Sequence, residues 1–161
     1  MNADEKKLLR KFVMQEADKA TGRLDAQTRY WRDEARKVTD ADTALAADAL
    51  AAWRKAVESY NAAIKGLKKL GYTAVDDSTR YGSTHDKVAT TVTLGLRQEE
   101  VNERVAKVDK AADVVRRKLD ETVRESLLEI VAGDLPGIRE QMSALRETLA
   151  ALVPPSPHDN H

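Results

Sequence analysis

The clearest apolar pattern in the chain lies between residues 43 and 70. Its large hydrophobic side chains are separated alternately by three and four residues, a spacing that places them on one face of an α-helix. This face consists of Leu50, Trp53, Val57, Tyr60, Ile64 and Leu67. Gly71 follows the pattern, and glycine is the usual residue just beyond a helix end. We therefore predict a helix over residues 43–70 that packs lengthwise along a partner helix.

A second long pattern lies in the C-terminal half of the chain. Its apolar positions have the same alternating spacing at Val101, Val105, Val108, Ala112, Val115 and Leu119. Beyond Leu119 the apolar face moves over by one position, to Val123, Leu127 and Ile130, as it does on an undistorted helix. The pattern predicts a helix over about residues 86–132.

The start of this second helix has two interpretations. Ser83 and Asp86 have the spacing of a helix N-terminal cap. Residues 90–93 that follow are β-branched, and Gly95 comes shortly after them, which disfavours a helix. Residues 88–96 are therefore expected to be helical, and a strand-like or kinked start is the alternative.

The first segment of the chain, residues 2–37, is also predicted to be helical. Asn2 and Glu5 have the spacing of a capping box, in which each side chain bonds to the other residue's backbone N–H. Apolar residues then recur on roughly one face, but this face is weak over residues 16–22. The sequence is thus compatible with a bend or break in that stretch.

The last predicted helix covers residues 135–153. Its apolar face consists of Ile138, Met142, Leu145, Leu149 and Leu152. Gly133 is expected to end the preceding helix, Asp134 to cap this one, and Pro136 to lie in its first turn, where its missing N–H costs little. The run of prolines that begins at Pro154 is expected to end the helix.

Together these elements predict an all-α protein: an antiparallel helical bundle with long, coiled-coil-like helices and one irregular central loop. The loop is expected over residues 72–85, which are rich in turn and cap residues and carry no helical stripe. We expect one helical domain over residues 1–153, because a chain of 161 residues is short for two domains. Residues 154–161 are predicted to form a flexible tail.

The composition agrees with long helices that have narrow apolar faces. Charged residues make up 34% of the chain and aromatic residues only 4%, which suits a β-sandwich poorly. The chain has no cysteine, so disulfides, thiolate metal sites and cysteine nucleophiles are excluded. The first residues lack the apolar stretch of a signal peptide, and no later run approaches membrane-spanning length. We expect a cytoplasmic or particle-associated protein that is not secreted through a signal peptide.

No group of residues predicts a catalytic or metal site. The only histidine away from the C-terminus is His85, and no Glu-x-x-His motif occurs, which argues against a helical metal centre. Glu121, Glu125 and Glu129 share one helical face, but interleaved arginines and lysines favour a salt-bridged surface. The stretch from Ser83 to Asp86 places a hydroxyl, an imidazole and a carboxylate side by side, and is better explained as a helix cap. We therefore expect no enzyme activity, metal or other cofactor.

Two other features admit a binding role. The large aromatic residues Tyr30, Trp31, Trp53 and Tyr60 could line a ligand slot between the first two helices, although their place on apolar faces favours core packing. Lys65, Lys68, Lys69 and Arg80 form a basic edge that could contact phosphates. The net charge of the chain is zero, however, which favours a solvated surface over nucleic-acid binding.

The unequal lengths of the predicted helices indicate a partner. The helix over residues 135–153 is too short to cover the two long apolar faces, and burial of those side chains would be favourable. The surface expected to bind the partner consists of Val101, Val105, Val108, Val115 and Leu119. A homo-oligomer or a helical protein partner is expected, and a compact three- or four-helix monomer is the alternative.

The sequence thus favours a non-enzymatic helical interaction protein. It would be a self-associating adaptor, scaffold or structural component of a larger assembly, for example of a viral particle or a multiprotein machine. The alternative is a small nucleic-acid-binding regulator that dimerises through its long helices.

Overall fold

The protein is an all-α helical bundle in the computed structural model, which describes residues 1–73, 91–133 and 135–158. Four helices occur in these ranges: α1 (Ala3–Ala35), α2 (Asp40–Lys69), α3 (Gln98–Ala132) and α4 (Ile138–Leu152). No strand occurs within the same ranges, so the predicted fold class is confirmed. None of these helices is long and apolar enough to cross a membrane.

The chain divides into two compact units. The first, here called the terminal unit, combines Met1–Lys37 with Arg97–His161 and contains α1, α3 and α4. The second, the central unit, is Val38–Leu96 and contains α2. The division describes contacts within the chain, so the expectation of a single folding domain over residues 1–153 stays a prediction.

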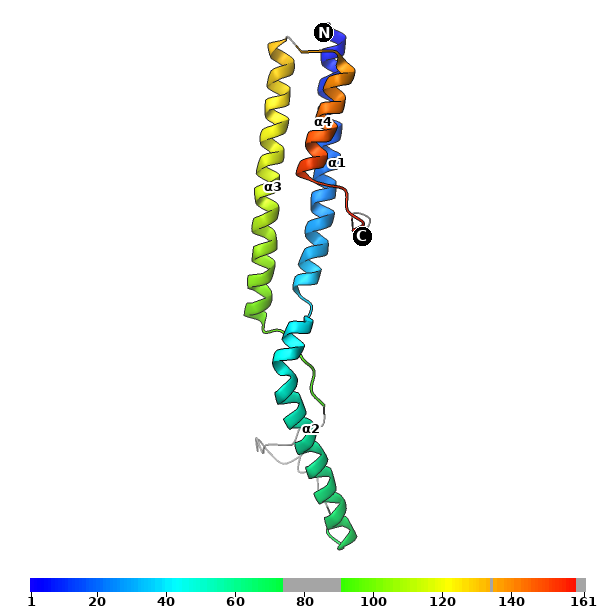
Figure 1. The fold of residues 1–161 in the computed structure, drawn as a ribbon, viewed down its shortest axis with the longest axis vertical. Helices are drawn as coiled ribbons and strands as arrows, with labels where there is room; N and C mark the ends of the chain where they lie inside the picture. Colours follow the sequence, from blue (N-terminus) through cyan, green and yellow to red (C-terminus); the bar gives the residue numbers. More distant parts are fainter. Residues whose placement is uncertain (74–90, 134, 159–161) are drawn as a thin grey trace. The chain divides into compact units, whose positions relative to one another are not determined.

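In the terminal unit, α1 and α3 run antiparallel, and the shorter α4 lies beside them (Figure 1). Each of the three helices contacts the other two. Their shared core contains Leu9, Phe12, Val13, Ala20, Leu24, Ala112, Leu119, Ile130, Leu145, Leu149 and Val153. Because α4 has 15 residues whereas α1 has 33 and α3 has 35, this three-helix core covers only part of the α1–α3 pair.

Helix α1 is continuous through residues 16–22, where the sequence admitted a bend or break. Its buried face passes through Ala17 and Ala20, which are small enough to pack closely against the neighbouring helices. Glu16, beside them, pairs with Lys19 at 2.7 Å and with Arg146 of α4 at 3.7 Å. The alanines therefore carry the core face across a stretch that contains no large apolar residue.

Ion pairs join α1 to α3 where α4 is absent. Arg32 Nε lies 2.6 Å from a carboxylate oxygen of Asp109, and Arg116 lies 3.0 Å from Asp25. Arg104 also donates a hydrogen bond to the backbone carbonyl of Lys37 at 3.3 Å. The hydrogen bond from Arg32 to Asp109 raises the pKa of the guanidinium. These contacts hold the two helices in one register along their exposed edge.

The apolar face of α3 shifts after Leu119 as predicted, but the helix begins later than expected. Leu119 and Ile130 are buried, and Val123 and Leu127 pack against the core between them. Residues 91–97 are neither helix nor strand, so the prediction that the helix already includes residues 91–97 is wrong. Residues 88–90 lie outside the described ranges. The β-branched residues and Gly95 explain why helix formation waits until Gln98.

Helix α4 also starts later than predicted, at Ile138 instead of residue 135. Its N-cap is Gly137, so Pro136 precedes the helix instead of lying in its first turn. Asp134, the predicted cap, lies outside the described ranges. At the other end, the predicted stop is confirmed, because α4 ends at Leu152. Val153, which follows, packs in the core and is only 1% exposed.

The predicted helix ends elsewhere follow from local hydrogen bonds. The capping box of Asn2 and Glu5 is present at the start of α1. A second box, formed by Thr39 and Asp42, starts α2 three residues earlier than predicted. Gly71 ends α2 with a φ of +90°, and its N–H bonds to the carbonyl of Lys68. Glycine is favoured there because it adopts this left-handed conformation without strain.

The structure describes only part of the predicted loop, residues 72–85, and of the predicted tail, residues 154–161. Most of the predicted loop over residues 72–85, with its Ser83–Asp86 cap, lies outside the described ranges, as do residues 159–161. Within the predicted flexible tail, the carbonyl of Pro154 accepts a 2.8 Å hydrogen bond from the side-chain amide of Gln27. The ring of His158 stacks on that of Tyr30 with centroids 3.8 Å apart. This part of the tail therefore contacts α1.

Candidate partner-binding surfaces

A partly exposed apolar face runs along α2. No side chain of α2 is buried, although every one of its 30 residues is described. We call its apolar face the α2 seam, defined by Leu50, Trp53, Val57, Tyr60, Ile64 and Leu67. Tyr60 is 45% and Leu67 44% exposed, and the other four side chains are half-buried. The predicted apolar stripe is present, and no part of it is enclosed.

The two edges of the α2 seam differ in chemistry. Ala49, Ala56 and Ala63 each precede a seam residue and form one edge. Arg54, Asn61 and Lys68 each follow a seam residue and form the other. Alanine side chains allow close approach of another backbone, whereas the polar edge stays compatible with water. The seam therefore has the apolar centre and asymmetric borders of a helix-packing surface.

The prediction that the large aromatic side chains pack in the core is wrong. Trp31 is 55% exposed, Tyr60 is 45% exposed, and Tyr30 and Trp53 are half-buried. The ring of Tyr30 stacks on that of His158 and makes an edge-to-face contact with the ring of Trp31. Amphipathic rings tolerate this half-exposed position because they are both apolar and polar. The alternative of a ligand slot stays a prediction.

A groove of about 240 Å³ runs between α1 and α3 in the terminal unit. Its wall is almost entirely apolar and consists of Leu24, Gln27, Thr28, Trp31, Val108, Ala111, Ala112 and Val115. The hydroxyl of Thr28 adds no free polar group, because it donates to the carbonyl of Leu24 at 2.7 Å. The groove exists because α1 and α3 continue beyond the reach of the shorter α4.

This groove includes two of the five residues predicted to bind a partner, Val108 and Val115. Val101 and Val105 are half-buried on the same helix. Leu119 must be removed from the predicted surface, because it is only 1% exposed and packs in the core of its own chain. A partner-binding role for the four valines stays a prediction.

A second apolar hollow on the α1–α3 pair was not singled out from the sequence. It is lined by Met14, Asp120, Val123, Arg124, Leu127, Leu128 and Val131. Leu128 and Val131 are each 60% exposed. The sequence does indicate this hollow, since Leu128 and Val131 lie beside the apolar face of α3 and widen it.

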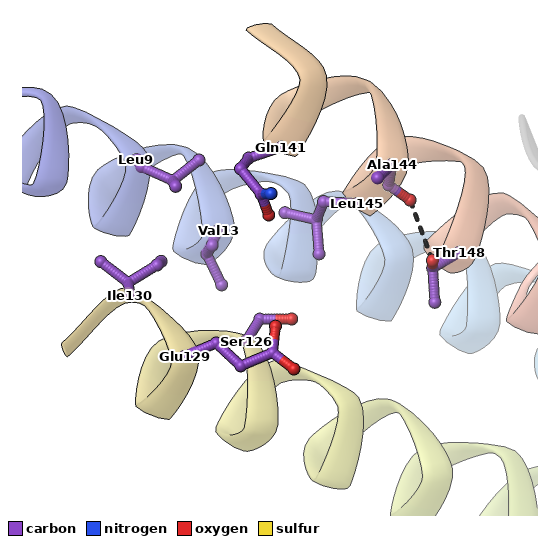
Figure 2. Close-up of a pocket in the computed structure, with 9 residues that line it drawn as sticks. All are labelled: Leu9, Val13, Ser126, Glu129, Ile130, Gln141, Ala144, Leu145 and Thr148. Atoms are coloured by element: carbon purple, nitrogen blue, oxygen red, sulfur yellow. Dashed lines mark hydrogen bonds between the residues drawn. The ribbon is translucent and has the colours of Figure 1, made fainter. Parts of the chain in front are cut away.

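A small pocket lies where α1, α3 and α4 meet (Figure 2). Its volume is about 130 Å³, which is below the size of ordinary ligand sites. Its two hydroxyls are satisfied within their own helices: Ser126 donates to Thr122, and Thr148 donates to Ala144. No buried side-chain polar atom in the described ranges lacks a partner. The pocket is best explained as imperfect packing between three helices.

The charged residues considered for chemistry are dispersed. Glu121, Glu125 and Glu129 are exposed, and no cluster suited to a metal ion occurs among the described residues. Lys65, Lys68 and Lys69 lie exposed at the end of α2. Arg80 and His85 fall outside the described ranges. The structure thus brings three members of the predicted basic edge together and leaves the role of the fourth as a prediction.

Comparisons with known proteins give no relative: no protein-family model, curated protein sequence or solved structure matches the chain. Functional inference therefore depends on the surfaces described above. The α2 seam extends from Leu50 to Leu67, over most of a 30-residue helix.

Proposed function

We propose that the protein is a non-enzymatic helical interaction protein that self-associates and serves as an adaptor, a scaffold or a structural component of an assembly. The observation that supports this proposal is the α2 seam, an apolar helix face with no buried residue. The absence of a catalytic motif in the sequence supports the non-enzymatic part.

The energetic reason for association is the apolar surface that a monomer leaves in water. Full burial of a Val, Leu, Ile or Phe side chain contributes roughly 1.5–3 kcal/mol. The α2 seam provides six large side chains that are only partly covered. Their combined burial can exceed the cost of joining two molecules, which is on the order of 4–15 kcal/mol. The compact-monomer alternative forgoes this contribution.

The proposal is tested by measuring the molar mass of the purified full chain by light scattering across micromolar concentrations. We expect a mass at least twice the 17.9 kDa of one chain. The same mass should persist at high salt, because apolar association is not screened by ions. A mass of one chain throughout the range would contradict self-association.

A second candidate function is binding to nucleic acid through the end of α2. Lys65, Lys68 and Lys69 are exposed, and none of them forms an ion pair within the described ranges. Three free cations at one helix end can contact consecutive phosphates.

A gel-shift titration at several salt concentrations tests this candidate. If these lysines contact phosphate, binding weakens steeply with salt, and their joint substitution by glutamate abolishes it. The matched control replaces Lys107, Lys110 and Lys118 of α3 by glutamate and keeps the same net charge. Equal loss in both variants, or no salt-sensitive binding at all, would remove this function.

A further inference from the structure

We propose that two copies of this chain pair through their α2 helices in antiparallel orientation, with the two-fold axis between residues 58 and 59. The inference rests on the proposed self-association and specifies its partner, surface and geometry. Three properties of α2 support it: the pairing of the seam residues, the chemistry of the two edges and the charges at the two ends.

The α2 seam is self-complementary in the antiparallel orientation. About a point between residues 58 and 59, Leu50 faces the partner's Leu67, Trp53 faces the partner's Ile64, and Val57 faces the partner's Tyr60. All six seam residues are used in both copies. A shift of one heptad leaves part of the seam without an apolar neighbour.

This pairing also matches large side chains with smaller ones. Each aromatic ring of the seam lies beside an aliphatic side chain: Trp53 beside the partner's Ile64, and Tyr60 beside the partner's Val57. A parallel pair would place Trp53 against the partner's Trp53 and Tyr60 against the partner's Tyr60. Alternation of large and small residues fills a helix interface at native density with less strain than stacked layers of equal size.

The edges of the seam fit the same orientation. The alanine edges of the two copies meet each other, so Ala56 lies beside the partner's Ala63 and the backbones can approach closely. On the polar edge, Arg54 lies beside the partner's Asn61, and Lys68 beside the partner's Ala47. No like charges meet across either edge.

The ends of α2 carry opposite charges. Asp40, Asp42 and Asp48 lie toward its N-terminus, and Lys65, Lys68 and Lys69 lie at its C-terminus. An antiparallel pair places the acidic half of each helix toward the basic end of the other and also opposes the two helix dipoles. A parallel pair would bring both basic ends together. Charge therefore favours the orientation that the seam residues select.

The first experiment compares two single substitutions by light scattering of the full chain. Val57→Glu places a charge beside the two-fold axis and is expected to raise the dimer Kd by at least about tenfold. Ala62→Glu adds the same charge to an exposed position off the seam and should leave the Kd unchanged. Circular dichroism of both variants confirms that the helices remain. A folded Val57→Glu variant that stays dimeric would overturn the α2 interface while leaving self-association in place.

The second experiment tests the register through rescue. Ile64→Trp alone places a second indole against the partner's Trp53 and should weaken dimerisation by roughly tenfold or more. Adding Trp53→Ile to the same chain restores one large and one small side chain in each layer, and dimerisation should recover. A parallel pair would also regain one tryptophan layer and one isoleucine layer, so this rescue tests the pairing of the seam residues, and the third experiment tests the orientation. Absence of recovery in a folded double variant counts against this register.

The third experiment measures orientation with spin labels, which attach only to introduced cysteines because the chain has none. Residue 48 lies about ten residues from the axis, so labels on two Asp48→Cys chains should be separated by roughly 30 Å along the helices. A mixture of Asp48→Cys and Lys69→Cys chains should give a much shorter distance. The reverse result would establish a parallel pair and overturn the inference. A wild-type chain that stays monomeric would contradict both the inference and the proposed self-association.

Discussion

Leu119 and Leu128 lie on the same helix but in opposite surroundings. Leu119 is 1% exposed within the three-helix core, whereas Leu128 is 60% exposed at the edge of an apolar hollow. The residue type is the same and the helix is the same, so the contrast isolates the effect of packing.

Substitution of these two leucines should therefore differ strongly in cost. Leu119→Ala removes a buried side chain and leaves a cavity, which is expected to lower the free energy of unfolding by about 2–5 kcal/mol. Leu128→Ala should change it by no more than about 0.5 kcal/mol. Urea denaturation followed by circular dichroism measures both values. Similar costs at the two positions would contradict the packing of the terminal unit.

Two glycines give a second contrast at the residue scale. Gly22 lies inside α1, and a Cβ added there meets nothing within 4 Å. Gly133 ends α3 with a φ of +107°, in the left-handed region that residues with a Cβ avoid. A side chain is therefore free of contact at the first position and strained at the second.

Gly22→Ala should stabilise the protein by about 0.5–1 kcal/mol, because alanine is the better helix former. Gly133→Ala should destabilise it by about 1–2 kcal/mol, because the backbone must remain left-handed to end α3. Thermal unfolding of the two variants beside the wild type measures the opposite signs. A stabilising Gly133→Ala substitution would show that the turn after α3 is not as described.

At the scale of elements, periodicity predicted the existence and faces of all four helices. It failed at three starts, because the preferences that decide them are local. The Thr39–Asp42 capping box starts α2 early. Helices α3 and α4 start late, at Gln98 and Ile138, after β-branched residues and glycine in the first case and Pro136 with Gly137 in the second. The continuity of α1 was uncertain in the sequence because Ala17 and Ala20 carry a weak apolar signal. Their contribution to the core depends on how closely two other helices approach them.

The candidate surfaces were predictable to different degrees. The α2 seam was visible in full, since its spacing alone defines it. The division of the α3 face into a buried Leu119 and a half-exposed Val108 was not, because it depends on where α4 ends beside it. The exposure of Trp31 has the same origin. The burial of these residues depends on which other helix packs against them, and the apolar pattern of a single helix does not contain that information.

The start of α4 offers a test of local capping. Its N-cap, Gly137, makes no side-chain cap bond, although Glu140 stands three residues later, as a capping box requires. Gly137→Ser should complete the box and stabilise the protein by a few tenths to about 1 kcal/mol, after the carboxylate of Glu140 moves aside. Gly137→Ala, which adds a Cβ without an acceptor, is the control and should destabilise it. Chemical denaturation of both variants measures the difference.

At the scale of the whole molecule, each unit contains one of the two tryptophans. Trp31 belongs to the terminal unit and Trp53 to the central unit. Trp53 is a member of the α2 seam, whereas Trp31 lines the groove between α1 and α3. Their fluorescence therefore reports separately on the α2 seam and on the groove between α1 and α3.

Association through α2 should change only one of these signals. In Trp31→Phe, the emission of Trp53 should shift to shorter wavelength as concentration rises, because the indole loses water. In Trp53→Phe, the emission of Trp31 should not depend on concentration. Fluorescence dilution series of the two variants measure this. A shift confined to Trp31 would assign association to the groove of the terminal unit instead.

The terminal unit is built from the two ends of the chain, with 59 residues of the central unit between them. During synthesis, α1 leaves the ribosome long before α3 and α4 exist. At roughly 5–20 residues per second, several seconds pass before its apolar face can be covered. The nascent chain thus exposes Leu9, Phe12 and Leu24 during that interval, and α1 can bury them only after α3 and α4 have been synthesised. The length of the inserted segment hardly affects the final stability, because loop-closure entropy grows only slowly with length.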